Sequence, residues 1–517
     1  MSRHLSRRAF MALVSAGTTI GFYRASCLQS NSKSQDMAFP QETVRVSHQR
    51  EFRGVWVATV LNLDWPSQPG LSVEVQKSEL IEILDRIQRL NFNAVILQVR
   101  PTGDAFYKSE VEPWSYWLTG EQGKAPEPFY DPLEFAVLEC HKRNIELHAW
   151  FNPYRAGKNL PNREPIKTVA PHISVTHPEY VYSYGSEQWM DPGAKVVQDQ
   201  LYNVILDVVR RYDVDGIHMD DYFYPYPQHI KNTDTSSIEQ HLPFPDDRTY
   251  ELYQQQGGKL SKADWRRDNV NKIIERLSVG LKNTKEHVKF GISPFGIYRP
   301  GQPPGISANI DPYEELHSDA KKWLEAGWID YLAPQLYWQI KAPQQSYPVL
   351  LKWWSENNPK KRHIYAGVAL YKIETQGWPI TELIQQIAIT RSLAPKLALG
   401  NIFFRVKFFN NSDVFNAFSS STYGEPALAP VMSWKKSQPS VMTPTILGVK
   451  DGNLTWKAAK NSNIRSWTLY QQVGNRWQLI KILNAGTTEI ELEPGTYALC
   501  AVDRMLNESI GVKIFVN

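Results

Sequence analysis

Short apolar runs alternate with segments of helical periodicity from about residue 52 to residue 420. Between the runs, apolar residues recur every three or four positions, as at Leu80, Leu84 and Ile87, which predicts amphipathic helices. Eight runs predict strands, at 53–60, 94–100, 145–151, 214–219, 288–293, 329–335, 363–369 and 399–405. Eight strand-helix units with nearly continuous apolar strands are typical of an α/β fold, the parallel (β/α)8 TIM barrel.

The connections after the predicted strands are long, and those that lead into the strands are short. The longest follow the second to fifth strands, at 101–130, 152–195, 220–263 and 294–312. Long strand-to-helix loops belong to the active end of a barrel. These loops also carry many of the 17 Trp and 25 Tyr residues. Core packing explains most aromatic residues, but rings beside polar groups also suit stacking on sugar faces.

The pattern changes after residue 423, so we expect the barrel domain to cover 47–423. Residues 424–445 are rich in Pro and Ser, which predicts a linker. Apolar and polar positions then alternate over 446–517, which predicts a small antiparallel β-sandwich. This segment resembles a fibronectin type III module, with Tyr497 placed as a tyrosine corner. Such a module usually spaces or docks other parts.

Residues 1–46 are expected to precede the fold. The pair Arg7-Arg8 stands before a mildly apolar stretch that is too short and too polar to remain as a membrane anchor. It resembles a twin-arginine export signal followed by a flexible leader, which predicts a protein of the periplasm or cell envelope. A lipid anchor at Cys27 is an alternative, although Arg24 stands where a lipobox has an aliphatic residue.

The composition excludes several classes of function. A chain of 517 residues that is 42% hydrophobic and 21% charged is a folded globular protein. The net charge of +4 leaves no basic surface for nucleic acid, since several positive residues lie in the first eight positions. Motifs for zinc proteases, phosphate-binding loops and serine hydrolases are missing, so no cofactor is predicted. Cys140 and Cys500 are expected to be buried thiols.

The candidate chemistry lies in residues 213–225, where an apolar strand runs into Asp220 and Asp221. Strand ends deliver catalytic groups in barrels, whereas the bland alternative is a pair of Asp residues that merely caps a strand. Side-chain alternation would place His218 and Asp220 on one face, and Met219 and Asp221 on the other.

Glycoside hydrolysis requires two carboxyl groups beside the scissile bond. The last three predicted strands end in Gln335, Leu370 and Arg405. The acids therefore concentrate after the fourth strand. We predict that Asp220 is the nucleophile or stabilises an oxocarbenium-like centre, with Asp221 or an acid from a neighbouring loop as its partner.

Amide, aromatic and basic side chains near the ends of the predicted strands are candidate contacts for sugar hydroxyls and rings. The predicted substrate contacts are Trp56, Gln98, Arg100, Asn152, Tyr154, His218, Tyr222, Gln335, Tyr337 and Trp338. Trp150, Arg155 and Ser293 stand in the same segments. Structural roles are the alternatives: an ion pair of Arg100 with Asp104 or Asp220, core packing of Trp56, and backbone contacts of Gln335.

A metal site is a further alternative. His148 and His218 end neighbouring predicted strands near Asp220, which would allow two histidines and a carboxylate to hold a metal ion, as in a polysaccharide deacetylase. A histidine in a barrel strand is more often a hydrogen-bonded core residue that orients a carboxylate. No metal ligand is therefore predicted.

Five sequence blocks occur in order over residues 50–420. They are RGVWV with DWP, QVRP with DAFY, HAWFNPYR, DGIHMDDYFYP and APQLYW, which begin at Arg53, Gln98, His148, Asp215 and Ala333. Together they resemble the glycosyl hydrolase-like family 10 proteins, an exported bacterial group. The resemblance implies a (β/α)8 glycosidase that cleaves glycan strands, with peptidoglycan the substrate expected in the cell envelope. A glycan-binding protein without turnover is the alternative, favoured by the few acids on other strands.

The block around Asp220 is also similar to the fourth-strand motif of the α-amylase superfamily, whose last Asp is the nucleophile. This similarity gives Asp220 that role and places His218 where an Arg usually orients it. The block is similar to that of family 18 chitinases as well, but Tyr222 stands where their catalytic Glu would fall. Arg405 departs from the small polar residues expected in the family at the end of the eighth strand.

Overall fold

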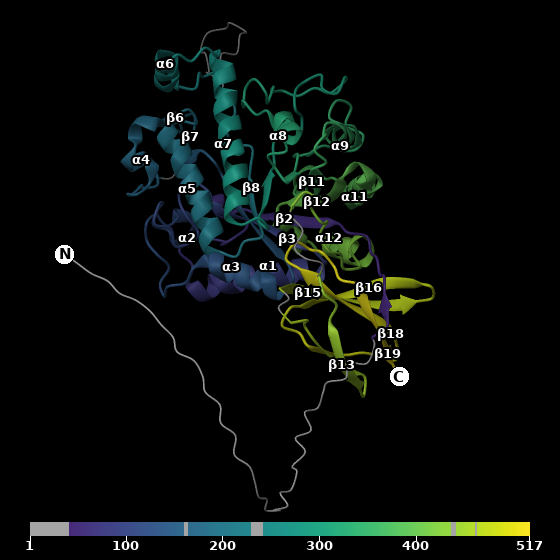
Figure 1. The fold of residues 1–517 in the computed structure, drawn as a ribbon. Coiled ribbons are helices and arrows are strands. Elements are labelled where there is room, and N and C mark those ends of the chain that lie inside the picture. Colours follow the sequence, from purple (N-terminus) through teal and green to yellow (C-terminus); the bar gives the residue numbers. More distant parts are fainter. Residues whose placement is uncertain (1–40, 160–163, 229–240, 436–440, 461–462) are drawn as a thin grey trace, which may run out of the picture. The chain divides into compact units, whose positions relative to one another are not determined.

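The computed structural model describes residues 41–159, 164–228, 241–435, 441–460 and 463–517. The twin-arginine pair and Cys27 lie outside the described residues. Residues 42–517 form one compact unit. Its centre is a closed barrel of eight parallel strands, so the predicted (β/α)8 fold is confirmed (Figure 1). The strands in barrel order are β2 (Phe52–Val57), β3 (Ala94–Arg100), β4 (Glu146–Phe151), β8 (Gly216–Met219), β9 (Lys289–Ile292), β10 (Tyr331–Leu332), β11 (His363–Ala369) and β12 (Ala398–Phe404).

Helices surround the barrel, as Figure 1 shows. The main ones are α1 (Val73–Arg89), α3 (Pro132–Lys142), α5 (Lys195–Arg211), α7 (Lys262–Thr284), α8 (Ala320–Ala326), α9 (Tyr347–Glu356), α11 (Ile380–Ser392) and α12 (Ser412–Ala417). Local sequence signals set where they begin. Asp131 caps α3 by accepting hydrogen bonds from two backbone N–H groups, and Pro132 occupies the first turn. Helix α1 buries Leu80, Leu84 and Ile87, as its periodicity predicts.

Pro334 explains why β10 is shorter than the run of apolar residues that predicts it. Strand β10 covers only Tyr331–Leu332. A proline has no N–H for the ladder, so regular pairing stops before Pro334. Gln335 continues the direction of the strand through isolated bridges to Phe295 and Gly367. The end of this strand is therefore free to turn its side chains toward the barrel mouth.

The strand-to-helix loops contain secondary structure of their own. The loop after β4 forms a small antiparallel sheet of β5 (Arg155–Lys158), β7 (Glu187–Met190) and β6 (Val181–Tyr184). The short helices in the loops are α2 (Tyr116–Thr119), α4 (Ile173–Thr176), α6 (Asp247–Gln255) and α10 (Lys372–Gln376). This structure supports the barrel mouth at the carboxyl ends of the strands.

Two antiparallel sheets are built from strands that follow the barrel in sequence, apart from β1, which precedes it and lies within the residues 1–46 that were expected to precede the fold. One has the order β1-β19-β18-β15-β16 and the other the order β13-β14-β17. Their strands are β1 (Thr43–Val44), β13 (Thr445–Lys450), β14 (Asn453–Lys457), β15 (Ile464–Val473), β16 (Arg476–Asn484), β17 (Glu489–Glu491), β18 (Gly495–Asp503) and β19 (Gly511–Val516). Trp456 and Trp467 lie in their shared core. The Tyr497 hydroxyl donates to the Glu493 carbonyl at 2.9 Å, which is the hydrogen bond of a tyrosine corner.

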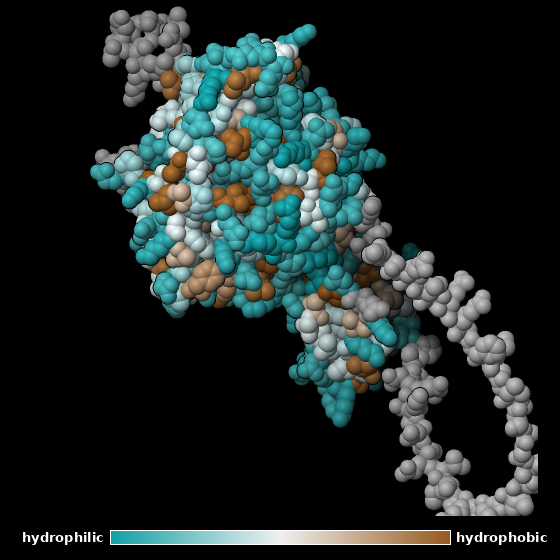
Figure 2. Space-filling model, turned by 60° about the vertical axis from the view of Figure 1, so that its left-hand side comes forward, coloured by the Kyte–Doolittle hydropathy of each residue, from teal (hydrophilic) through white to brown (hydrophobic). Residues whose placement is uncertain are grey.

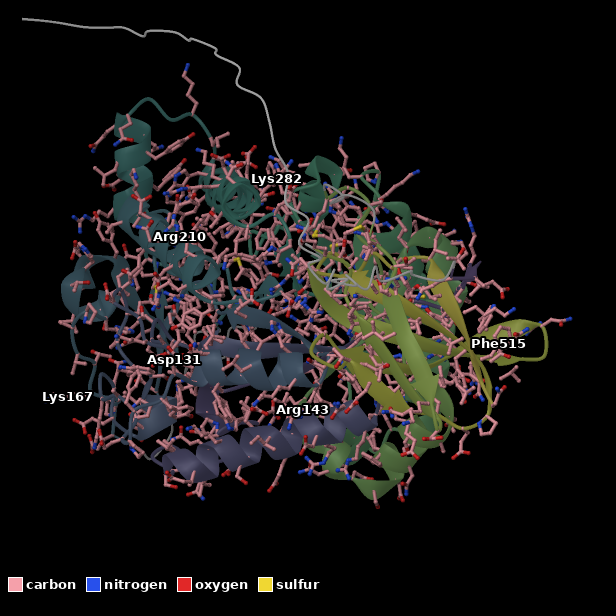
Figure 3. The ribbon with its side chains drawn as sticks, turned by 60° about the horizontal axis from the view of Figure 1, so that its bottom comes forward. Asp131, Arg143, Lys167, Arg210, Lys282 and Phe515 are labelled. Carbon is pink, nitrogen blue, oxygen red and sulfur yellow. The ribbon has the colours of Figure 1, made fainter. Side chains whose placement is uncertain are left out.

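These sheets contact the end of the barrel where the strands begin, opposite the active end. Arg465 of β15 forms an ion pair with Asp215, which precedes β8. Asn144 donates to the Ile482 carbonyl at 3.1 Å, and Asn484 donates to the His141 carbonyl at 3.0 Å. Figure 3 brings this end forward, with Arg143 labelled among the helices and Phe515 on the sheets.

The described part of the Pro- and Ser-rich segment also packs against the barrel. Leu428, Ala429 and Met432 are buried beside the first residues of the barrel strands. The Trp434 indole donates to Asp330 at 2.7 Å. These contacts hold the segment in place between barrel and sheets.

The surface is mostly hydrophilic on the face drawn in Figure 2, where apolar side chains form only small groups. Cys140 and Cys500 are free and buried, as predicted. Over the described ranges, no helix has both the length and the apolar character needed to cross a membrane.

Candidate active site

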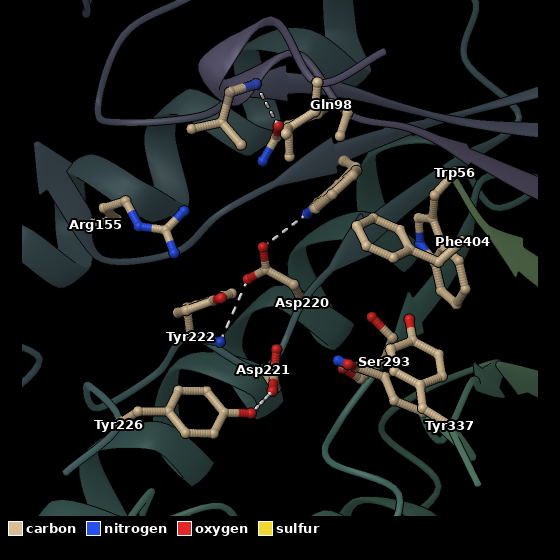
Figure 4. A pocket seen from close by; sticks show the side chains of 15 residues that line it. Trp56, Gln98, Arg155, Asp220, Asp221, Tyr222, Tyr226, Ser293, Tyr337 and Phe404 are labelled. Atoms are coloured by element: carbon tan, nitrogen blue, oxygen red, sulfur yellow. Dashed lines mark hydrogen bonds between the residues drawn. The ribbon is translucent and has the colours of Figure 1, made fainter. Parts of the chain in front are cut away.

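A cavity of about 250 Å³ opens at the carboxyl ends of the barrel strands (Figure 4). The fifteen residues that line it are Trp56, Ala58, Val60, Leu63, Gln98, Trp150, Arg155, Asp220, Asp221, Tyr222, Tyr226, Ser293, Gln335, Tyr337 and Phe404. They come from the ends of most barrel strands, so residues that are distant in sequence meet in this pocket.

Asp220 and Asp221 both line the pocket. The alternation that would place them on opposite faces is wrong, because β8 ends at Met219 and the chain turns beyond it. Figure 4 shows the two carboxyl groups between Tyr222 and Tyr226 on one side and Ser293 on the other. The pocket therefore offers two neighbouring acids to one ligand.

Three donors hold the Asp220 carboxyl group. The Trp150 indole and the Asn152 amide donate to Oδ2 at 2.9 and 3.1 Å, and the backbone N–H of Tyr222 donates to Oδ1 at 3.4 Å. Burial, followed by the nearby charge of Asp221, raises the pKa of Asp220 to about 7. Protonation of Asp220 is therefore easier than that of an exposed Asp side chain.

Asp221 is held by Tyr226, whose hydroxyl donates to Oδ2. Burial raises the pKa of Asp221, and the hydrogen bonds from Tyr226 and Gln335 oppose that effect. The charge of Asp221 also raises the pKa of Asp220, so the two acids titrate as an interacting pair.

Arg155 supplies positive charge to the pocket. Its guanidinium lies 4.1 Å from the centre of the Tyr222 ring, and its Nε is 3.2 Å from a Glu187 carboxylate oxygen. The Asn152 side chain accepts a hydrogen bond from the Arg155 backbone at 2.9 Å. The Asn152 side chain thus links the backbone of Arg155 to Asp220. The charge of Arg155 opposes the rise in the pKa of Asp220.

Five of the predicted substrate contacts line the pocket: Trp56, Gln98, Tyr222, Gln335 and Tyr337. Gln98 also accepts hydrogen bonds from the backbone of Thr59 at 3.0 Å and Val60 at 2.9 Å, which shapes the loop after β2. Asn152 acts on Asp220 directly, and His218 lies behind the pocket, where the Trp56 indole donates to it at 3.2 Å.

Three other predicted contacts lie outside the lining. Arg100 makes a buried two-pronged ion pair with Glu112, at 2.6 and 2.8 Å. This is a structural role, with Glu112 in place of the expected Asp104 or Asp220. Tyr154 is fully buried in the barrel core, and Trp338 packs edge-on against Phe295.

Sequence reasoning did not select Tyr226 or the apolar wall formed by Ala58, Val60, Leu63 and Phe404. Tyr226 follows Pro225, and only the turn made there brings its hydroxyl back to Asp221. No periodicity in the sequence predicts such a return. The apolar residues lie at or just after the ends of predicted strands, and this position is the sequence feature that could have indicated them as pocket residues.

Residues 51–380 match the family described as Glycosyl hydrolase-like 10. The chain belongs to this family. It is 39% identical over 495 residues to glycosyl hydrolase YngK of Bacillus subtilis, covering 89% of this chain and 92% of the relative. It is 36% identical over 406 residues to glycosyl hydrolase DigH of Escherichia coli K12, covering 74% of this chain and 88% of the relative. By family and by its relatives, the protein is a glycosidase.

Solved structures are more distant. The catalytic domain of a β-amylase from Paenibacillus polymyxa aligns with a TM-score of 0.45 at 10% identity, covering 76% of this chain and all of that domain, 100%. The glycoside hydrolase domain of PgaB from Bordetella bronchiseptica aligns with a TM-score of 0.43 at 16% identity, covering 71% of this chain and 97% of that domain.

Arg405, which departs from the residues expected for Glycosyl hydrolase-like 10 proteins, has a structural partner. It forms an ion pair with Asp64 at 3.3 Å. Asp64 also accepts a hydrogen bond from the backbone of Ala58 at 2.9 Å. The pair joins the ends of β12 and β2, so Arg405 holds the pocket wall that Phe404 and Ala58 form.

The geometry disfavours a metal site at His148 and His218. Their Nδ1 atoms lie 2.8 and 3.0 Å from the same hydroxyl group, that of Tyr331. Their Nε2 atoms are engaged by Glu146 and by Trp56. Within the described ranges, no three His, Cys, Asp or Glu side chains are grouped so that they could hold a metal ion.

Proposed function

We propose that the protein is an exported glycosidase that cleaves the glycan strands of peptidoglycan, with Asp220 and Asp221 as its catalytic carboxyl groups. The carrying observation is that both acids follow one barrel strand and line one pocket with aromatic and amide groups. Two carboxyl groups beside one bond are what glycoside hydrolysis requires. Membership of a glycosyl hydrolase-like family supports the same conclusion.

The two acids would have different roles in the reaction. Trp150 and Asn152 donate to Asp220, which favours its ionised form and suits a nucleophile or a stabiliser of positive charge at the anomeric carbon. Asp221 then serves as the acid that protonates the departing oxygen. Burial raises the pKa of Asp221, which favours the protonated form that a general acid needs.

The lining supports a sugar ligand. Trp56, Tyr337 and Phe404 offer aromatic surface, and Gln335 and Arg155 offer hydrogen bonds and charge. Peptidoglycan is proposed because the sequence resembles an exported cell-envelope group and begins with a twin-arginine-like segment. For the proposed export, replacing Arg7 and Arg8 by Lys should leave the protein in the cytoplasm on cell fractionation; unchanged export would exclude the twin-arginine route.

The assignment predicts that Asp220→Asn abolishes hydrolysis, with activity at least about 10³-fold below that of the unchanged enzyme. The mature protein and the variant would be incubated with isolated peptidoglycan sacculi, and released reducing ends would be measured. Asp207→Asn, which changes an acid on the exposed side of α5, is the matched control and should keep full activity.

Each outcome separates the alternatives. Equal release by the enzyme and Asp220→Asn would contradict the role of Asp220. Saturable binding to sacculi without fragments would support a glycan-binding protein instead. Loss of activity with a chelator would support the metal-dependent alternative, whereas carboxyl chemistry should persist.

A further inference from the structure

A line of polar side chains runs through the interior of the barrel and ends behind the pocket. It consists of Lys289, Glu146, His148, Tyr331 and His218, each at most 6% exposed, and we call it the interior column. Lys289 Nζ lies 2.6 Å from Glu146 Oε2, which lies 3.2 Å from His148 Nε2. The Tyr331 hydroxyl then joins His148 Nδ1 at 2.8 Å to His218 Nδ1 at 3.0 Å. Barrel interiors are usually filled with branched apolar side chains, so this polar set is unusual.

The column ends on two residues of the pocket lining. His218 Nε2 accepts a hydrogen bond from the Trp56 indole at 3.2 Å and lies 3.0 Å from the Ser293 hydroxyl. Both Trp56 and Ser293 line the pocket, where Figure 4 labels them. His218 is fully buried and is not part of the lining.

The direction of each hydrogen bond follows from the indole, which can only donate. His218 Nε2 must therefore carry a lone pair, and the proton of this neutral imidazole lies on Nδ1. That proton is donated to the Tyr331 hydroxyl, which in turn donates to His148 Nδ1. His148 then carries its proton on Nε2 and donates to Glu146. The five groups and the indole form one consistent chain of donors and acceptors.

The backbone leaves room for this chain. A Cβ atom on Gly291 would lie 1.9 Å from the ring of Tyr331, and one on Gly216 would lie 2.5 Å from His148 Nδ1. Any side chain at either position would displace the column. Burying polar groups is costly unless every one is paired, and here each hydrogen bond is made.

We propose that Tyr331 is a positioning residue of this glycosidase. Its hydroxyl holds His218 as the neutral Nδ1–H form, so that the single lone pair on Nε2 accepts the Trp56 indole N–H beside the Ser293 hydroxyl in the pocket wall. Tyr331 acts through His218 and does not touch the ligand. The inference rests on the proposed function only in taking the pocket as the glycan site.

The arrangement also determines what Trp56 can offer a ligand. Its N–H is used by His218, so the nearly buried indole borders the pocket with ring carbons and not with a donor. The contact at this position is therefore with a C–H face of a sugar ring. A column that releases His218 would let the ring turn and would weaken that contact.

The test compares Tyr331→Phe with Tyr365→Phe. Tyr365 is equally buried in the barrel, with its ring 5.0 Å from that of Tyr331, but its hydroxyl is paired with His363 outside the column. Each change removes one buried hydroxyl, so losses of stability should be similar. We expect kcat/KM on peptidoglycan to fall about tenfold or more for Tyr331→Phe and less than about threefold for Tyr365→Phe.

A second readout follows the imidazoles directly. In protein labelled with ¹⁵N-histidine, the nitrogen chemical shifts assigned to His148 and His218 should show neutral rings with fixed proton positions, and Tyr331→Phe should change the resonances of both. Tyr365→Phe should leave them unchanged. If Tyr331→Phe does not fold, Trp56→Phe removes the donor at the other end and should change the His218 resonances.

The outcomes keep this inference separate from the proposed function. Equal effects of the two Tyr variants on kcat/KM, or histidine resonances unchanged by Tyr331→Phe, would overturn the positioning role. If the unchanged protein releases no reducing ends, the proposed function fails, whereas the histidine spectra still test the column. Changed spectra with unchanged kcat/KM would show that the column forms but does not position the site, which also overturns the proposal.

Discussion

Asp220 is held by opposing influences. Burial and Asp221 raise its pKa to about 7, whereas Arg155 and the hydrogen bond from Trp150 lower it. The charge of Arg155 and the hydrogen bond from Trp150 thus favour the ionised form that the proposed role of Asp220 requires. The sequence predicted the acids and several neighbours, because strand ends carry the active groups of a barrel. It could not predict Tyr226, whose contact with Asp221 depends on a turn.

We expect Trp150→Phe to shift the pH dependence of kcat/KM. The indole N–H bonds to the ionised form of Asp220, so its loss should raise the pKa of that carboxyl. If Asp220 must be ionised, the limb of kcat/KM that rises with pH should move up by about one pH unit. Trp354→Phe, which removes a buried indole bonded to a backbone carbonyl, is the control. Identical pH profiles for the two variants would contradict the role of Trp150.

The barrel strands show which parts of an element a sequence can predict. Continuous apolar runs predicted all eight strands, because both faces of each strand are buried. Some strand ends differ from their predicted positions. Pro334 shortens β10, and β8 begins at Gly216, after Val214 and Asp215. The sequence assigned no role to the glycines inside the strands. A pattern of apolar residues does not reveal that a ring from a neighbouring strand occupies the space beside a glycine.

Gly216→Ala tests whether a strand glycine is needed to leave room for a neighbouring ring. The added methyl group would lie 2.5 Å from His148 Nδ1 inside the closed barrel, so we expect a loss of about 1–3 kcal/mol in the free energy of unfolding. Gly448→Ala, on strand β13, is the control, because nothing lies within 4 Å of its Cβ. Urea unfolding would measure both variants. Equal stability of the two would show that the barrel adapts to the extra atom.

In the whole molecule, Asp215 links barrel and sheets. It accepts hydrogen bonds from the Leu147 backbone and His141, both at 2.9 Å, and forms an ion pair with Arg465 of β15. The first Asp of the motif that ends in Asp220 is thus structural. The alternation of apolar and polar residues after residue 446 predicted the sheets. It did not predict their attachment to the barrel, because a charged residue in a sequence does not indicate which opposite charge it will pair with.

Arg465→Met should weaken this attachment in a pH-dependent way. Burial alone would raise the pKa of Asp215, but Arg465 and His141 hold it well below its usual range. A lowered pKa stabilises the folded protein above about pH 4, and that stability is lost as the pH falls. We expect Arg465→Met to cost about 3 kcal/mol at pH 7 and less below pH 4.

Urea unfolding at pH 7 and at pH 3 would measure this difference. Arg276→Met is the control, since the exposed Arg276 pairs with Asp199 and should contribute less than about 1 kcal/mol. A cost for Arg465→Met that is the same at both pH values would contradict the proposed contribution of Asp215.

The pairing of β1 with β19 has a consequence for biosynthesis. Thr43 and Val44 pair with Val512 and Gly511. One segment is made near the start of translation and the other near its end, and they form one edge of a sheet. The early segment has no partner in this sheet until the late one has emerged from the ribosome. A chain that stalls before residue 511 would therefore leave Thr43 and Val44 without the strand with which they pair.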